Sequence, residues 1–90
     1  KVNSTRITGT TTLDNTYHTV FCDSDGGAFT VTLPAGDNGR HYRIINCGSS
    51  GNVVTIAPNG AELLTGANAS RTISDKSVII LEYETTEGWY

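Results

Sequence analysis

Charge is scarce in this chain of 90 residues: only 17% of the residues are Asp, Glu, Lys or Arg, and the formal net charge is −3. The six basic residues are scattered singly, so the sequence has no basic stripe of the kind that neutralises nucleic-acid phosphates. Long apolar runs are also lacking, and none approaches the roughly 20 residues needed to cross a bilayer. We therefore expect neither a nucleic-acid partner nor insertion into a membrane.

Cysteine is limited to Cys22 and Cys47, each at the end of a strand-like run. They form either a disulfide or two small buried thiols, and the sequence leaves both open because bridging needs Cα atoms within about 7 Å. Two cysteines do not make a structural zinc site, and the two histidines are not spaced to complete one. The segment Asp23-Ser24-Asp25-Gly26 resembles part of a calcium loop, but the EF-hand pattern requires Glu where Thr32 stands. We expect no metal and no cofactor.

What the chain does have is threonine, β-branched aliphatic residues and ten glycines spread along its length. Such a composition favours short strands separated by turns and leaves no room for a long helix. The sequence predicts an all-β fold, a small antiparallel β-sandwich or partly open barrel. The strand-like runs are residues 17–22, 29–33, 41–47, 52–57, 71–73, 76–84 and 88–90.

Residues 1–12 are rich in Thr and Ser, and we expect them to be a connector from a preceding module, with the β-domain spanning residues 13–90. The chain begins with Lys1 rather than Met, which suggests a part of a longer polypeptide. The polar break at Asp23–Gly27 predicts a hairpin between the first two runs. Because no segment repeats at a fixed period, we expect no solenoid.

Strict alternation predicts which side chains face the core. Phe29, Val31 and Leu33 lie on one face of their run, and two threonines lie on the other. By the same reasoning we expect the following residues in the interior: Phe29, Val31, Leu33, Ile44, Val54, Ile56, Ile79 and Leu81.

Catalytic residue types are present, but no spacing unites them. His18, His41, Asp14 and the serines match no nucleophile–base pattern, and no serine stands in a G-x-S-x-G turn. Glu82 and Glu84 share one face of a strand, as a carboxylate pair for glycoside hydrolysis would, or as charges that discourage edge-to-edge aggregation. We expect that the chain is not an enzyme.

Aromatic residues gather at the C-terminal end. Trp89, with Tyr90 and Tyr83, is a candidate platform on which a sugar ring stacks. The alternative is that Trp89 packs in the core, because tryptophan is highly buried on average.

The run Val78-Ile79-Ile80-Leu81 has four consecutive aliphatic residues, whereas a half-buried strand alternates. Both faces of this strand are therefore expected to be covered. One face, with Ile79 and Leu81, fills the subunit's own core. The other, with Val78 and Ile80, either contacts another subunit or lies between two layers of the same sandwich.

Several segments in order carry a resemblance: Phe-Thr-Val-Thr-Leu-Pro at 29–34, Tyr-Arg-Ile-Ile-Asn at 42–46, Gly-Asn-Val-Val-Thr-Ile at 51–56, and Val78 to Leu81 before a closing Gly88-Trp89. Over residues 17–90 this order is similar to small β-domains near the distal ends of bacteriophage tail fibres and tailspikes. The resemblance implies a non-enzymatic homotrimer in the virion, at the phage tail and facing the extracellular medium. Its partners would be copies of itself and a host cell-surface glycan or protein receptor.

A second function fits the same residues. The alternative is a monomeric carbohydrate-binding module of a secreted bacterial protein, and such a module needs an exposed aromatic platform with polar neighbours. A trimer-forming domain needs instead an apolar surface that remains exposed after each subunit has folded. The two hypotheses therefore differ in association state.

Overall fold

The computed structural model describes residues 4–14, 16–36 and 39–90. These residues form nine strands and no helix, which confirms the all-β prediction. The strands are β1 (Ser4–Ile7), β2 (Thr11–Thr12), β3 (Thr19–Cys22), β4 (Phe29–Thr32), β5 (His41–Asn46), β6 (Val54–Ala57), β7 (Arg71–Ile73), β8 (Val78–Glu84) and β9 (Gly88–Trp89).

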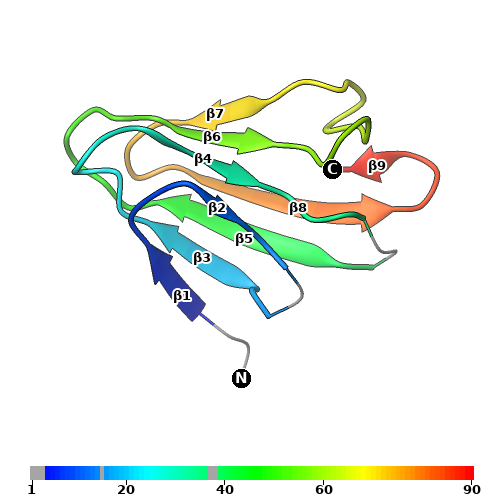
Figure 1. Ribbon diagram of the computed structural model, residues 1–90, viewed down its shortest axis with the longest axis horizontal. Helices are drawn as coiled ribbons and strands as arrows, with labels where there is room; N and C mark the ends of the chain where they lie inside the picture. The colour runs from blue at the N-terminus through cyan, green and yellow to red at the C-terminus, as the bar shows by residue number, and fades with distance from the viewer. Residues whose placement is uncertain (1–3, 15, 37–38) are drawn as a thin grey trace.

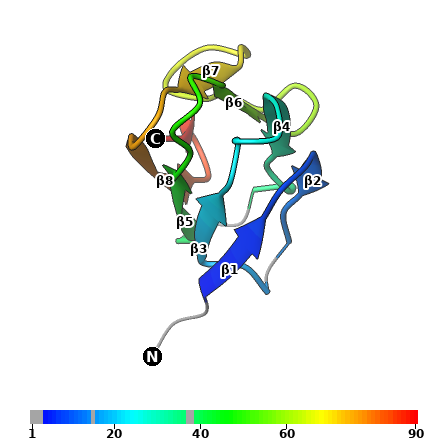
Figure 2. The ribbon, with the colours of Figure 1, turned by 90° about the vertical axis from the view of Figure 1, so that its left-hand side faces the viewer.

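The strands build two sheets that face each other (Figures 1 and 2). A five-stranded sheet has the order β1-β3-β5-β8-β9, and a four-stranded sheet has the order β2-β4-β6-β7. The shortest extent of the domain is 18 Å, which suits two layers whose centres are about 10 Å apart. Neither sheet closes on itself, so the architecture is an open two-layer sandwich and not a barrel.

The expected antiparallel pairing is wrong for half of the domain. β1, β3 and β5 pair in parallel in one sheet, and β2, β4 and β6 pair in parallel in the other. Among the nine strands of the described residues, antiparallel pairs occur where β7, β8 and β9 join the sheets. The sheets are mixed because the chain crosses from one layer to the other after each of its first five strands, and such a crossing returns the next strand in the same direction.

This topology also shows that two further predictions are wrong. Asp23–Gly27 turns the chain from β3 into β4 in the opposite sheet and not into a hairpin. The alternate winding between sheets also resembles a short, irregular solenoid, which the sequence did not predict. The turns of this winding differ in length, since Thr19 pairs with Ser4 on one side and with Arg43 on the other, so no period appears in the sequence.

The predicted connector is part of the domain from Ser4 onward. β1 pairs with β3, β2 pairs with β4, and Ile7 is buried in the core cluster. The alternation that reveals other strands is hidden here, because both elements are short and lie at sheet edges, where one flank of each faces solvent. Residues 1–3 of the predicted connector lie outside the described residues.

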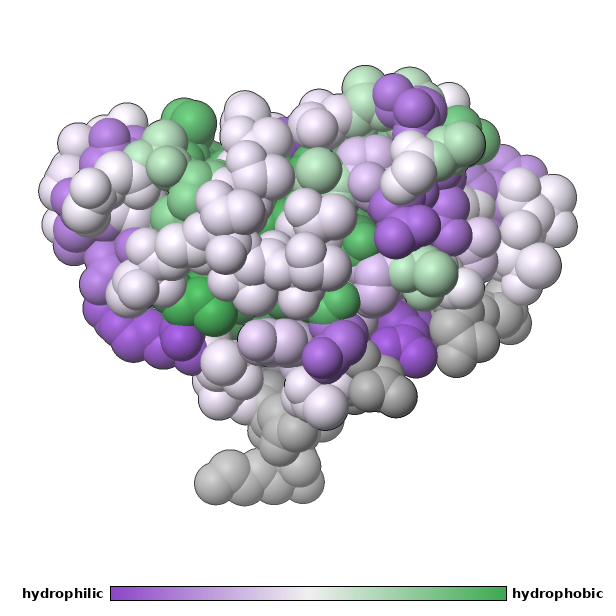
Figure 3. All heavy atoms as spheres, viewed as in Figure 1, coloured by the Kyte–Doolittle hydropathy of each residue, from purple (hydrophilic) through white to green (hydrophobic). Residues whose placement is uncertain are grey.

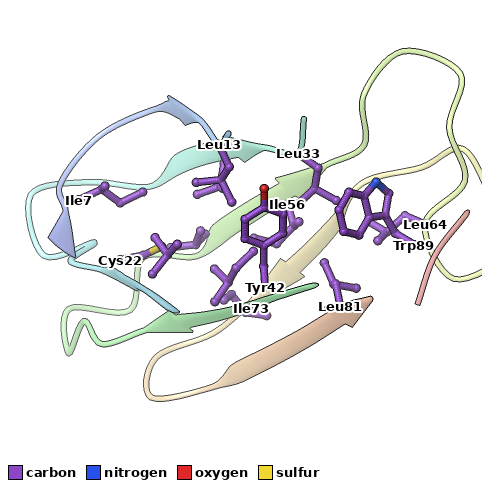
Figure 4. Packing of buried hydrophobic residues seen from close by; sticks show 14 of the residues in the cluster. Ile7, Leu13, Cys22, Leu33, Tyr42, Ile56, Leu64, Ile73, Leu81 and Trp89 are labelled. Carbon is purple, nitrogen blue, oxygen red and sulfur yellow. The ribbon is translucent and has the colours of Figure 1, made fainter. Parts of the chain in front are cut away.

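The core lies between the two sheets, where side chains from both layers meet (Figure 4). Seven of the eight residues expected in the interior are buried, and Ile79 is partly buried and packs against the same cluster. Tyr42, Leu13, Leu64 and Trp89 complete its bulkiest part. Alternation therefore identified the inward faces correctly, even though the strand neighbours differ from those expected.

Candidate interaction surface

Trp89 is a core residue and is not available as a sugar platform. Its side chain is fully buried, with ring centroids 5.7 Å from Tyr42 and 5.2 Å from Tyr83. The indole Nε1 donates a hydrogen bond of 3.3 Å to Glu62 Oε1. Figure 4 shows the indole among core side chains. The short strand β9 pairs with the end of β8 and carries Trp89 inward, so the core-packing alternative is correct.

The other two candidate aromatic residues, Tyr83 and Tyr90, differ in solvent exposure. Tyr83 is half-buried, and its ring lies where a side chain on Gly36 would stand, so the two positions pack directly. Tyr90 is 50% exposed, and its hydroxyl lies 3.4 Å from Glu87 Oε1. Of the predicted platform, only Tyr90 offers a ring to a ligand.

An apolar surface lies on the outer face of the five-stranded sheet. Val78 and Ile80 are 46% and 59% exposed, as expected of residues on the face of β8 that does not reach the core. In register across the sheet, Val78 is opposite Ile45 of β5, and Ile45 is opposite Phe21 of β3. Phe21 and Ile45 are half-buried and alternate with buried neighbours, so they share this outer face. We call Phe21, Ile45, Val78 and Ile80 the outer apolar patch.

The sequence predicts only half of this patch. Val78 and Ile80 were evident because four aliphatic residues in a row break the alternation of a strand. The neighbours of Phe21 and Ile45 along each strand are also apolar or buried, so alternation does not show which of them face outward. Their outward direction is clear only from the register with β8. The continuous aliphatic pair Ile44-Ile45 was the available signal.

Charged residues surround the outer apolar patch. Arg6 of β1 stands opposite Phe21, and Arg43 of β5 stands opposite Ile80. The Arg6 guanidinium forms an ion pair of 2.6 Å with Asp23, and the hydrogen bond and charge of that carboxylate raise the pKa of Arg6. Glu82, next along β8, stands opposite His41. The apolar residues are therefore framed by both signs of charge, as in the polar rim of a protein interface.

The opposite outer face, on the four-stranded sheet, carries small polar side chains. Thr30, Thr55 and Thr72 lie side by side in register on β4, β6 and β7, and Thr12 lies beside Thr32. Figure 3 shows this region over β4 and β6 as a pale surface of intermediate hydropathy. The two outer faces thus differ in chemistry, and the outer apolar patch lies on the five-stranded sheet.

The loop that resembled a calcium site is occupied by protein partners. Asp23 binds Arg6, and Asp25 Oδ1 accepts hydrogen bonds from the Ser49 backbone N–H (2.8 Å) and the Ser50 hydroxyl (2.9 Å). These two bonds, the backbone one first, lower the pKa of Asp25. The carboxylates hold neighbouring loops together. In residues 4–14, 16–36 and 39–90, no three His, Cys, Asp or Glu side chains gather as a ready metal cluster.

The candidate catalytic groups are not assembled into one site. Asp14 is held by the Thr16 backbone N–H at 2.9 Å, and hydrogen bonds from Thr16 lower its pKa. His18 and His41 contact each other through their Nε2 atoms. Glu82 and Glu84 are exposed on β8, and Glu84 accepts hydrogen bonds from the backbone of Thr86 and Glu87. Over the described part of the chain, no pocket encloses these groups.

Cys22 and Cys47 are both free thiols. The Cys47 backbone N–H donates to the Cys22 carbonyl at 3.0 Å, so the two residues are neighbours across β3 and the end of β5. Cys22 faces the core, whereas Cys47 Sγ lies 3.9 Å from Arg6 Nη1 on the outer side. Neighbouring backbones with side chains on opposite faces do not form a disulfide.

We expect the two thiols to differ sharply in reactivity. Burial, the largest cause, raises the pKa of Cys22 to about 12, so its nucleophilic thiolate is almost absent at pH 8. Iodoacetamide should label Cys47 in the native domain and Cys22 only after unfolding, as read by mass spectrometry of peptides. Because the folded-state pKa is raised, the contribution of this thiol to stability falls as pH rises above the ordinary 9.0 toward about 12. Equal labelling rates would contradict the assigned orientation of β3.

Comparison with known proteins gives no family. No protein-family model matches the sequence, and no curated protein matches it. Among the residues that the structure describes, no helix is long and apolar enough to span a membrane. The fold and the surface define an all-β, two-layer domain with mixed sheets and an apolar patch on one outer face.

Proposed function

We propose that the chain is a non-enzymatic, trimer-forming domain of a bacteriophage tail fibre or tailspike, and that it contributes to attachment to the host surface. The outer apolar patch carries this proposal. A folded domain that leaves Val78 and Ile80 about half exposed, in register with Ile45 and Phe21, has an apolar face that water does not favour. A second copy of the chain is the partner that the proposal assigns to this face.

Threefold symmetry follows from the resemblance to phage fibres and not from the fold. A cyclic arrangement closes the assembly and stops growth into filaments. In such an assembly the threonine face of the four-stranded sheet remains in contact with water or the host surface. A receptor, either a glycan or a protein, would then meet exposed loops and Tyr90 at the C-terminal end.

The carbohydrate-binding alternative loses its main support. A monomeric module needs a flat exposed aromatic surface, and the only tryptophan in the sequence is buried. Of the three candidate platform residues, only Tyr90 has a side chain that is about half exposed to solvent. No observation specific to a sugar site favours this function, so the trimer-forming role is preferred.

The decisive experiment is the mass of the isolated domain in solution. Light scattering and sedimentation across a dilution series should give three times the subunit mass. Ile80→Asp should yield a folded monomer, because a carboxylate on each subunit would have to lose its water at the contact, and the cross-strand neighbour Arg43 offsets that cost only in part. The far-ultraviolet spectrum of the variant should match that of the parent, since Ile80 does not pack in the core.

Val53→Asp is the matched control. Val53 is 39% exposed and precedes β6 of the other sheet, so the same chemical change is made outside the outer apolar patch. This variant should keep the parent's mass. A parent that stays monomeric at high concentration would reject self-association. A dimer that Ile80→Asp dissociates would support the outer apolar patch as the contact between subunits but reject threefold symmetry. If Ile80→Asp and Val53→Asp changed the mass equally, the outer apolar patch would be rejected as the contact.

A further inference from the structure

Two histidines meet at one end of the five-stranded sheet. His18 precedes β3 and His41 begins β5, and because these strands are parallel their first residues lie at the same end. β8 runs antiparallel to β5 and brings Glu82 opposite His41. Residues that are far apart in the sequence are therefore brought to the same end of the five-stranded sheet.

The contact between the rings is made by the nitrogen atoms. His18 Nε2 and His41 Nε2 are 2.8 Å apart, whereas the ring centroids are 4.6 Å apart, so both rings turn their Nε2 corners toward a common region. The interplanar angle is 83°. Without a cation, one Nε2–H donates to the lone pair of the other Nε2, so at least one ring is neutral.

We propose that His18 and His41 form a binding site for a divalent transition-metal ion, with Glu82 as a third ligand. Imidazole nitrogen suits Ni²⁺, Cu²⁺ and Zn²⁺. At metal–nitrogen distances of about 2.0–2.1 Å, ligands at a right angle are about 2.9 Å apart, and tetrahedral ligands about 3.3 Å. The observed Nε2 separation matches the right-angled arrangement typical of Ni²⁺ and Cu²⁺.

Metal binding changes the tautomer and not the fold. When both rings are neutral, the proton on one Nε2 moves to Nδ1 of the same ring, so that both Nε2 lone pairs face the ion and no net proton is released. His18 Nδ1 lies 3.2 Å from the Thr19 hydroxyl, which can accept the relocated N–H. Such a second hydrogen bond commonly orients metal-binding histidines. The neighbouring residue thus already supports the required tautomer.

Glu82 is placed to complete the ligand set by a side-chain rotation. Directly opposed residues of an antiparallel pair have Cβ atoms about 4.5–5.5 Å apart on the same face. Glu82 is exposed, and a rotation about its side-chain torsions brings its carboxylate toward the rings. In the present conformation the three groups do not form a cluster, so water supplies the remaining ligands and the carboxylate joins when the ion is bound.

The test is titration of the domain, purified without a histidine tag, with Ni²⁺, followed by calorimetry and by the melting temperature. One ion per chain should bind and raise the melting temperature, whereas Mg²⁺, which prefers oxygen ligands, should do neither. His18→Ala and His41→Ala should each weaken Ni²⁺ binding by at least about tenfold, and the isosteric Thr19→Val should weaken it less, by up to about tenfold. Glu82→Gln should weaken it without abolishing it.

Binding of Ni²⁺ that is unchanged in both histidine variants would overturn the proposal, as would a lack of saturable binding. His41 is exposed and His18 is half-buried outside the core cluster, so circular dichroism of each variant separates loss of a ligand from loss of the fold. If Glu82→Gln left Ni²⁺ binding unaltered, the assignment of the carboxylate would be wrong. The site does not depend on the proposed trimer, because both rings belong to one chain.

Discussion

Replacing Trp89 with alanine is expected to lower the free energy of unfolding by about 3–5 kcal/mol, through lost burial and the cavity left behind. Trp89 has the largest fully buried side chain, and it lies against Tyr42 and Tyr83 between the ends of the two sheets. Because a domain of this size has a total stability of only about 5–10 kcal/mol, the variant should be largely unfolded at moderate temperature. Urea unfolding followed by circular dichroism measures the change.

Two control variants show whether the loss of stability comes from the buried indole of Trp89. Tyr90→Ala, at the adjacent half-exposed residue, should cost less than about 1 kcal/mol, since surface substitutions rarely exceed this. Trp89→Phe keeps the ring but loses the hydrogen bond to Glu62, and it should fall between the two. A Trp89→Ala variant as stable as the parent would show that the C-terminal strand is not packed into the core. It would also restore Trp89 as a ligand-binding candidate.

Replacing Asn46 with aspartate should cost at least about 3 kcal/mol at neutral pH, although the two side chains have the same shape. Asn46 is fully buried, and its amide makes four hydrogen bonds. Its oxygen accepts from the Ser24 hydroxyl (2.8 Å) and the Gly48 N–H (3.0 Å), and its nitrogen donates to the carbonyls of Asn52 (3.1 Å) and Ile73 (3.0 Å).

Aspartate cannot donate twice, so both carbonyl groups lose their donor, at about 1–3 kcal/mol each. A carboxylate is also buried without a cation, which adds to the cost. Burial raises the folded-state pKa of such a carboxyl above its unfolded value. The destabilisation should therefore be smallest below the unfolded pKa of about 3.9 and should grow as pH rises.

The measurement is urea unfolding of parent and variant at several pH values. Asn59→Asp, at an exposed asparagine, is the control and should change stability by less than about 0.5 kcal/mol. A difference between parent and Asn46→Asp that shrinks as pH rises would contradict the predicted sign. Such a result would mean that the carboxylate meets a cation or water in the folded state.

Asn46 also shows why part of this structure was beyond sequence reasoning. An asparagine at the end of a strand-like run is normally taken as solvent-facing, and Asn46 is not among the residues that the sequence predicts in the interior. Two of its partners, Gly48 and Asn52, lie in the loop that follows β5, whereas Ser24 and Ile73 come from the β3–β4 loop and from β7, which only the folded chain brings to Asn46. The network ties the five-stranded sheet to the four-stranded sheet.

The histidine pair shows the same limit. His18 and His41 are separated in the sequence, and no motif spacing joins them. Parallel pairing of β3 and β5 places them at one end of a sheet, whereas the expected antiparallel arrangement gave no reason for them to meet. The candidate metal site therefore follows from the strand direction, which was the part of the fold that was predicted wrongly.

The sequence by itself determined the all-β class, most strand positions and the inward direction of nearly every residue that it assigned to the interior, because alternation of apolar and polar side chains is a local property of an extended chain. Phe29, Val31 and Ile56 are buried whichever strand lies beside them. Only the tertiary structure decided which strands are neighbours and in which direction they run, since parallel and antiparallel partners satisfy the same alternation. For that reason the burial of Trp89, the extension of the patch to Phe21 and Ile45, and the entry of residues from Ser4 onward into the sheets depend on contacts between distant segments.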